Sequence, residues 1–234
     1  MLDKQVEFYE ASVSELLSPR LTVLITTIDR KERVNAAPFS FFTPVSYEPI
    51  RVAFSCIRYK HFFIPGAHAH ATDRQIPNIE QYAGETEETL KDTVKNIEEN
   101  GEFGVNVLPI EYVRQMSYTA LRYPYGVDEL EMAGLHVYHS TRIRSPLIKE
   151  AMTAIECKVI AENNFGSGNQ VWTLVVGEGL AVHVDAKLIG VKGFRIEQIS
   201  AILNAAKQSY GVCTNFREDP YVLYPEVTPM PSDD

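Results

Sequence analysis

Residues 21–55 read LTVLITTIDRKERVNAAPFSFFTPVSYEPIRVAFS. Three runs rich in β-branched and aromatic residues alternate with polar turns, and they predict strands over residues 21–28, 34–42 and 51–55. The charged residues 29–32 form the first turn, and a polar bend precedes the third strand. Short strands joined by polar turns are typical of an antiparallel sheet or barrel.

The middle strand has an unusual composition for the centre of a sheet. Pro38 cannot donate a backbone hydrogen bond to a neighbouring strand, and Ala36 and Ala37 leave the backbone without bulky side chains. Such a segment suits a strand whose backbone is approached closely by something flat.

Four segments follow one another in an order that a known family shows. They are TTID (26–29) with NAAPFSFF (35–42) and SYEP (46–49), then KDTVKNI (91–97), then YGVDEL (125–130) with AGL (133–135), and finally IECKV (155–159). In these motifs the chain resembles the flavin reductase-like proteins, and more specifically the branch often called the DIM6/NTAB flavoprotein oxygenases. The resemblance covers roughly residues 18–185, and four motifs in the family's order make it fairly specific.

This resemblance implies a mainly β fold with peripheral helices, an antiparallel Greek-key split β-barrel of the type that binds flavin mononucleotide (FMN). It implies an FMN-binding oxidoreductase that either reduces flavin with NADH or NADPH or oxidises or oxygenates a small substrate. The alternative is a non-catalytic FMN-binding or storage protein on the same barrel. Members of the family are usually homodimers with the flavin near the subunit interface, so a second copy and a small molecule are the expected partners.

Matched position by position, the motifs imply that FMN is held by the small-residue strand, the following strand and a helix start. Lys91 would supply the cation that a phosphate needs, and the adjacent helix start would supply the N–H groups. The same residues are also consistent with an ordinary surface lysine next to an ordinary helix cap. Cys56 could line the flavin ring, but it is equally consistent with a small residue of the core. The residues implied to bind FMN are Thr27, Asn35, Ala36, Ala37, Ser40, Ser55, Cys56, Lys91, Asp92, Thr93 and Asn96.

Catalytic residues stay unassigned, because the sequence shows no obvious general base. That agrees with hydride transfer between stacked rings, which depends on geometry more than on a proton donor. His183 is interpreted first as a structural histidine, with a proton carrier as the alternative. The acids of residues 128–131 are interpreted as a solvated turn rather than as paired catalytic carboxylates.

Composition limits the possible function classes. The 234 residues carry a net charge of −9 with a pI near 5.2, which argues against general nucleic-acid binding because that needs a basic surface. No apolar run reaches the length of a membrane span, and the polar first ten residues are unlike a signal peptide. Three cysteines at wide spacing favour free thiols in a reducing cytoplasm over a disulfide scaffold.

The expected organisation is a barrel with additions at both ends and one insertion. The insertion contains His61, His68 and His70, but no Cys or carboxylate cluster accompanies them, so a loop or dimer contact is preferred and no metal is predicted. The segments are a lead-in (1–17), the barrel domain (18–190) with its insertion (about 58–85), and a C-terminal helix with an extended tail (191–234).

Apolar periodicity predicts two helices outside the strands. Residues 86–100 have apolar side chains at intervals of four and three, and Gly101 follows as a C-terminal stop. This helix starts either at Thr86 or at Thr93, since each hydroxyl can cap a first turn. Residues 194–208 are amphipathic in the same way and predict the C-terminal helix.

A hairpin is predicted later in the chain. Residues 152–160 and 170–183 alternate as two strands around a connection rich in turn residues. Gly177 and Gly179 within the second strand predict a bulge or tight bend of the kind that barrel closure requires.

Overall fold

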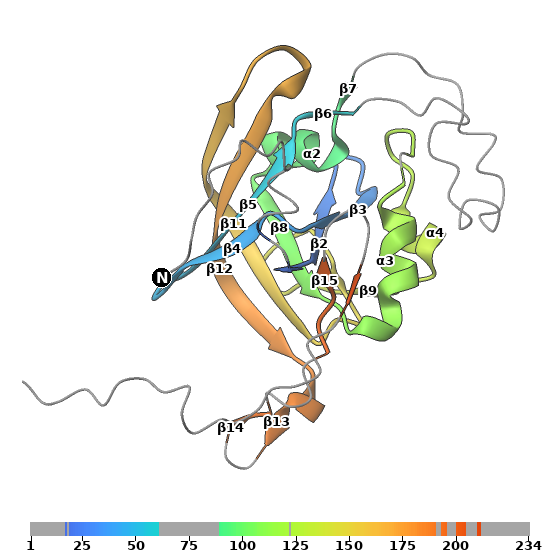
Figure 1. Ribbon diagram of the computed structural model, residues 1–234, viewed down its shortest axis with the longest axis vertical. Helices are drawn as coiled ribbons and strands as arrows, with labels where there is room; N and C mark the ends of the chain where they lie inside the picture. Colours follow the sequence, from blue (N-terminus) through green and yellow to red (C-terminus); the bar gives the residue numbers. More distant parts are fainter. Residues whose placement is uncertain are drawn as a thin grey trace, which may run out of the picture.

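The structure is a computed structural model that describes residues 17, 19–60, 89–121, 123–190, 193–195, 200–204 and 210–211. Its body is one curved antiparallel sheet (Figure 1), in the neighbour order β3-β2-β8-β11-β12-β5-β4. The strands of this sheet are β2 (Val23–Ile28), β3 (Val34–Phe39), β4 (Phe42–Tyr47), β5 (Ile50–Ile57), β8 (Glu102–Val107), β11 (Thr153–Phe165) and β12 (Trp172–Val184).

The two edge strands follow each other directly in the chain. Only Ser40 and Phe41 separate β3 from β4, and the Ser55 N–H of β5 bonds the Phe41 carbonyl oxygen at 2.9 Å. The sheet therefore curls until its edges meet at this corner, which gives a barrel that stays split between β3 and β4. The predicted fold class, a mainly β antiparallel split barrel with peripheral helices, is confirmed.

Smaller elements surround the barrel. The helices are α2 (Asp92–Asn100), α3 (Val113–Thr119) and α4 (Glu129–Ala133), and the 3₁₀ turns are η3 (Ile110–Tyr112), η4 (Gly168–Gln170) and η5 (Ala186–Leu188). The short strands are β1 (Arg20–Leu21), β6 (Tyr59–Lys60), β7 (Thr89–Leu90), β9 (Val137–Tyr138), β10 (Leu147–Ile148), β13 (Ile189–Gly190), β14 (Gly193–Phe194), β15 (Leu203–Asn204) and β16 (Tyr210–Gly211). Within the ranges given above, no helix has the length and apolar character needed to traverse a lipid bilayer.

Side chains from the two faces of β2 and β3 enter two different cores. Val23 and Ile25 point into the barrel, where they pack with Phe54 and Phe103. Leu24 points the other way, into a second cluster formed with α3 and α4, which cover the outside of β3 in Figure 1. Because both faces are buried, β2 is apolar or uncharged along its whole length.

Helix α2 packs against one end of the barrel. Val94 and Ile97, three residues apart on one face, belong to the barrel core. The helix ends as predicted at Gly101, whose φ of 67° is left-handed and whose N–H bonds the Ile97 carbonyl oxygen at 2.7 Å. This packing places the first turn of α2 beside the edge strand β3.

Both proposed starts of that helix are wrong. Thr89 and Leu90 belong to β7, so the helix begins only at Asp92, with Lys91 in the N-cap position and no side-chain cap. Thr93 is the second helical residue, and Thr86 lies outside the described part of the chain. Pairing of β7 with β6 takes priority over helical periodicity at this point.

The strand predicted over residues 34–42 ends at Phe39, and the expected polar bend is the strand β4. This strand contains Pro44, which an edge strand tolerates because its outer side needs no donor, and its register shifts between Pro44 and Ser46. Because of this proline and this register shift, the sequence of β4 lacks the regular apolar–polar alternation by which a strand is predicted.

The helix predicted over residues 194–208 is also wrong at its described residues, 194–195 and 200–204; the remainder lies outside the described part of the chain. Phe194 belongs to β14, and Leu203–Asn204 form β15, which pairs with β1. Ile202 is buried in the second core, and its carbonyl oxygen accepts the Thr22 N–H at 2.9 Å. Of the apolar residues at helical spacing, the described Ile202 is thus buried in a core, and the described Leu203 pairs with a distant strand. The three insertion histidines and the C-terminal tail lie outside the described residues.

Candidate functional site

A pocket of about 320 Å³ opens where β3, the start of α2 and the α3–α4 segment meet. Small-molecule sites occupy roughly 300–1,000 Å³, so the pocket lies at the small end of that range. The edge strand contributes Asn35, Ala37 and Pro38, and α2 contributes Lys91 and Asp92. The opposite wall is formed by residues 119–121, Tyr123 and Glu129, and Ile57 and Tyr59 complete the lining.

Four of the residues expected to bind a cofactor therefore line one pocket, namely Asn35, Ala37, Lys91 and Asp92. They come from two segments more than fifty residues apart in sequence, and the packing of α2 on the barrel brings them together. This convergence is the main correspondence between the sequence motifs and the geometry.

Three further expected residues form a buried layer behind Asn35. The Asn35 Nδ2 donates to Thr27 Oγ1 at 3.0 Å and to Thr93 Oγ1 at 3.2 Å. The Asn96 Nδ2 donates to the same Thr27 oxygen at 3.1 Å. All four side chains are at most 5% exposed, so this network holds Asn35 in one orientation at the pocket surface.

The remaining four expected residues do not line the pocket. Ala36 packs into the second core, and Ser40 and Ser55 are half-buried near the corner between β3 and β5. Cys56 lies inside the barrel core, where burial raises the pKa of its thiol to about 11 even though Lys91 acts to lower it. The thiol is thus neutral near pH 7, as expected for a small core residue.

The acidic segment 128–131 is not the solvated turn that the sequence suggested. Asp128 caps α4 by accepting the Leu130 and Glu131 N–H groups, which places Glu129 in the first helical turn. Glu129 is only 5% exposed, and its Oε2 accepts the Ala36 N–H of the edge strand at 3.0 Å. The helix cap thus directs one carboxylate into the pocket.

Arg58 fixes the start of α2 against the barrel. Its carbonyl oxygen accepts the Lys91 N–H at 2.9 Å, and its guanidinium pairs with Glu98 of α2 and with Glu162 of β11. Burial alone would lower the pKa of Arg58, but hydrogen bonding and attraction to Glu98 raise it, so the cation persists. The ammonium group of Lys91 lies 4.8 Å from the Phe39 ring centroid.

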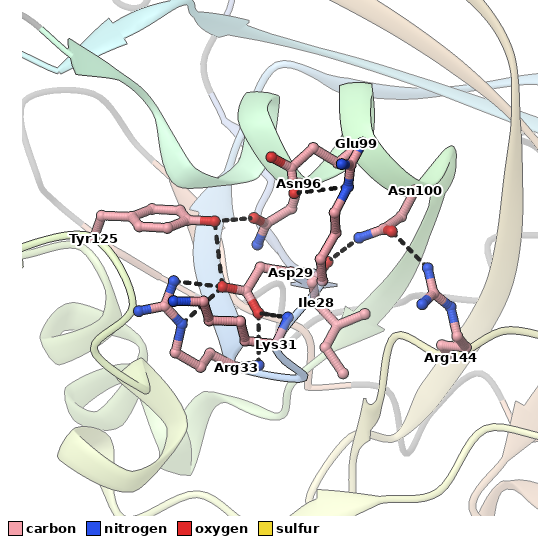
Figure 2. Close-up of polar contacts among 10 residues, drawn as sticks. Ile28, Asp29, Lys31, Arg33, Asn96, Glu99, Asn100, Tyr125 and Arg144 are labelled. Atoms are coloured by element: carbon pink, nitrogen blue, oxygen red, sulfur yellow. Dashed lines mark hydrogen bonds and ion pairs between the residues drawn. The ribbon is translucent and has the colours of Figure 1, made fainter.

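A polar cluster at the other end of α2 anchors the α3–α4 wall (Figure 2). The buried Asp29 carboxylate accepts N–H groups of Lys31 and Arg33, whose hydrogen bonds lower the pKa of Asp29 against the raising effect of burial. The Tyr125 hydroxyl lies 3.3 Å from Asp29 Oδ2 and 3.4 Å from Asn96 Oδ1. Tyr125 therefore links the wall to the layer behind Asn35.

Two cations lie against the Tyr125 ring. The Arg33 guanidinium carbon is 4.8 Å from the ring centroid, and the Lys95 ammonium is 3.6 Å from it. Gly126 follows, and a side chain there would meet Arg33 Nη1 at 2.2 Å. These contacts hold the loop before α4, and with it Tyr123, at a fixed distance from β3.

An aromatic surface adjoins the pocket on the outside of the barrel. Phe54 and Cys56 of β5 point inward, so Ile57, the last residue of the same strand, points outward and lines the pocket. Trp172 is paired with Ile57 across the sheet, and its ring lies 5.6 Å from that of Phe41. Ile57 of the pocket lining thus has as its neighbour an aromatic pair whose rings are tilted by 30° to each other.

Sequence reasoning missed Glu129, Tyr123 and the aromatic pair of Phe41 and Trp172. Glu129 belongs to a motif that was recognised, but nothing local separates it from its exposed neighbour Glu131. In the ranges that the structure covers, no group of three or more His, Cys, Asp or Glu side chains is arranged to hold a metal ion.

Comparison with known proteins identifies the family of this chain and proteins with the same fold. A family model described as flavin reductase like domain matches residues 17–192. The uncharacterized protein YwrF of Bacillus subtilis (strain 168) is 30% identical over 178 residues, which cover 75% of this chain and 74% of YwrF.

Two solved structures share the architecture. Nitrilotriacetate monooxygenase component B from Bacillus cereus superposes with a TM-score of 0.71 at 23% identity, covering 93% of this chain and 98% of that chain. The FMN-binding protein from Thermus thermophilus, solved with bound 1-cyclohex-2-enone, gives a TM-score of 0.63 at 17% identity, covering 92% and 98%. At these identities the likeness concerns the fold alone.

Proposed function

Because the chain belongs to the flavin reductase-like family, we propose that it binds FMN in the pocket beside β3 and acts as an oxidoreductase. One observation carries the proposal: a strand with small residues, an uncapped helix start and a lysine converge on a single pocket. The name of the FMN-binding structural neighbour supports the choice of flavin.

The residues present fit the two ends of FMN. Lys91 and the first-turn N–H groups of α2, which the N-cap side chain does not cap, would hold the phosphate. Asp92 lies in the same turn, so the Lys91 cation has to offset its charge. Ala37, Pro38 and Ile57, with the neighbouring pair of Phe41 and Trp172, offer apolar surface for a tricyclic ring.

When bound, FMN would supply the electron transfer, while the chain supplies binding, orientation and exclusion of water. Asn35, held by Thr27 and Thr93, would orient the ligand, and the α3–α4 wall would cover it. We propose NADH or NADPH as the reductant and a small organic molecule as the substrate. The cyclic enone bound to the Thermus protein supports a substrate of that size.

The test is a titration of the purified protein with FMN, followed by anaerobic addition of NADH or NADPH. Saturable binding and bleaching of the oxidised flavin absorbance are expected. Binding without bleaching by either nucleotide would instead favour the storage alternative, and failure to bind FMN would reject the proposal.

Replacing Lys91 by Met is expected to weaken FMN binding about tenfold or more, because a charge-assisted bond to phosphate contributes about 1.5–3 kcal/mol. Riboflavin lacks the phosphate, so its affinity should stay unchanged. The dissociation constants are measured by quenching of flavin fluorescence. Lys158→Met, which removes an exposed lysine of β11 outside the pocket lining, is the matched control. Equal weakening of both ligands would contradict the phosphate assignment.

We also propose a homodimer with the flavin near the subunit interface. Exposed apolar side chains on the β4–β5 hairpin and on β12 support it, because a second copy would cover them. They are Val45, Tyr47, Ile50, Leu180 and Val182, of which Tyr47 is 94% exposed. Light scattering should give twice the 26.4 kDa chain mass, and Tyr47→Glu should shift the mass towards the monomer. A monomeric wild type would reject the dimer.

The cysteines support the cytoplasm as the compartment. Cys56 and Cys157 are free thiols buried in the barrel core. A denatured sample purified without reductant should titrate as three thiols per chain, whereas a disulfide-linked pair would argue for an oxidising compartment.

A further inference from the structure

Arg58 joins the start of α2 to the long β11–β12 hairpin. Its backbone N–H bonds the Val171 carbonyl oxygen at 2.8 Å, and its own carbonyl oxygen accepts the Lys91 N–H at 2.9 Å. Among the described residues that line the pocket Arg58 is absent, although both of its chain neighbours, Ile57 and Tyr59, are present. Arg58 thus connects residues that line the pocket without lining it.

The Arg58 guanidinium has partners on both of these elements. Its Nη2 donates to Glu98 of α2, and its Nη1 lies 3.3 Å from Asn164 Oδ1 and 3.5 Å from Thr173 Oγ1 on the hairpin. Glu162 Oε1 lies 3.9 Å from the same Nη1 atom. The side chain is only 15% exposed, and these partners hold the planar group in one place. The guanidinium is therefore a fixed link between the hairpin and α2.

This link holds the face of α2 that lies opposite its other polar anchors. The Asn96 Nδ2 bonds Thr27 of β2, and the Asn100 Nδ2 bonds the Ile28 carbonyl oxygen. Each of these two asparagines is two residues from Glu98, and consecutive residues of an α-helix are about 100° apart around the axis. Side-chain bonds on opposite faces therefore fix the direction of α2, and with it the position of its first turn at the pocket.

On the premise that the pocket binds FMN, as proposed above, we infer that Arg58 is a positioning residue for the phosphate. By bonding Glu98, it holds the first-turn N–H groups of α2 and Lys91 where the phosphate binds. A carboxylate on this helix then increases the affinity for an anion, although its own charge repels that anion. The ring and the ribityl chain contact other parts of the pocket, so their binding does not depend on this link.

The variant Glu98→Gln separates positioning from electrostatics, because the two effects have opposite signs. The substitution removes a negative charge, so electrostatics alone would leave the FMN affinity unchanged or increase it. Loss of the charge-assisted bond to Arg58 is instead expected to weaken FMN binding about three- to tenfold, because the start of α2 loses its support. Riboflavin lacks the phosphate and should bind as it does to the wild type. The dissociation constants are measured by quenching of flavin fluorescence.

The matched control is Glu99→Gln, which makes the same charge change at the next residue of the same helix. The Glu99 carboxylate lies 3.8 Å from the Arg30 guanidinium, whose side chain is 75% exposed, so this pair contributes little to the position of the helix. Glu99→Gln should not weaken FMN binding. The inference is overturned if Glu98→Gln binds FMN as tightly as the wild type, if it weakens FMN and riboflavin equally, or if Glu99→Gln weakens FMN to the same extent.

Arg58→Lys is the second test, and it keeps the positive charge. One ammonium group replaces the planar fork, so it cannot bond Glu98 and the hairpin groups together. FMN binding should again weaken about three- to tenfold with riboflavin unchanged, and adding Glu98→Gln should weaken it little further, because both changes remove the same link. Fully additive effects would overturn the inference. Failure of the wild type to bind FMN would reject the proposed function instead.

Discussion

Replacing Glu156 by Gln is expected to lower the free energy of unfolding by about 3 kcal/mol at pH 7, since each pKa unit corresponds to about 1.4 kcal/mol. The Glu156 side chain is fully buried, yet its pKa is lowered from 4.5 to about 2. Burial alone would raise the pKa. The hydrogen bonds from the Thr141 and Arg142 N–H groups and from His183 outweigh it.

The geometry explains this strength. Glu156 Oε1 accepts from Thr141 N at 2.9 Å and from His183 Nε2 at 2.7 Å, and Oε2 accepts from Ile143 N at 3.1 Å. In Gln the side-chain NH2 group would take the place of one acceptor oxygen and face these N–H donors, so buried N–H groups would be left unpaired. His183, whose role the sequence left open, is thus a partner of Glu156 and has the structural role that was preferred.

The pH dependence has a definite sign. Because the pKa of Glu156 is lower in the folded state, its contribution is complete above about pH 4.5 and is lost as the pH falls towards 2. Urea unfolding at pH 7, 5, 4 and 3 should show the wild type losing stability across this window, with a flatter curve for Glu156→Gln. Glu178→Gln, which breaks a partly exposed pair with Arg51, should cost at most about 1 kcal/mol. Equal effects from the two variants would contradict the explanation.

Replacing Gly177 by Ala is expected to destabilise the barrel by about 1–3 kcal/mol, the usual cost of overpacking a core. A Cβ there would lie 2.4 Å and 2.6 Å from two ring carbons of Phe103 and 3.2 Å from Cys157 Cβ. Phe103 is fully buried and packs edge-on against Phe54 at 5.3 Å, so it has little room to move. The glycine is therefore required by the ring that faces it across the sheet.

A double-mutant cycle tests this pairing. Phe103→Ala alone should cost about 3–5 kcal/mol through the cavity that it leaves. Combined with Gly177→Ala it should cost less than the sum, because the new methyl group enters that cavity, with a coupling of about 0.5–3 kcal/mol. The free energies are measured by urea unfolding of the four proteins. Strict additivity would mean that the ring and the glycine do not constrain each other.

Local residue patterns were enough for much of the architecture and part of the site. The β-branched runs of residues 21–55 predicted β2, β3 and β5, since alternation is a property of each strand by itself. Gly101 marked the end of α2, because a left-handed residue favours glycine there. Gly177 and Gly179 marked the register shifts of the β11–β12 hairpin.

The tertiary structure decided the features that depend on distant partners. Glu129 and Ala36 are 93 residues apart, and only the packing of α4 on β3 turns an acidic turn into part of a pocket. The apolar spacing of residues 194–208 predicted a helix, but pairing with β1 makes a strand of Leu203–Asn204. Periodicity indicates which side chains are buried. Which backbone groups find partners, and which carboxylates line the pocket, depends on segments that meet only in the folded chain.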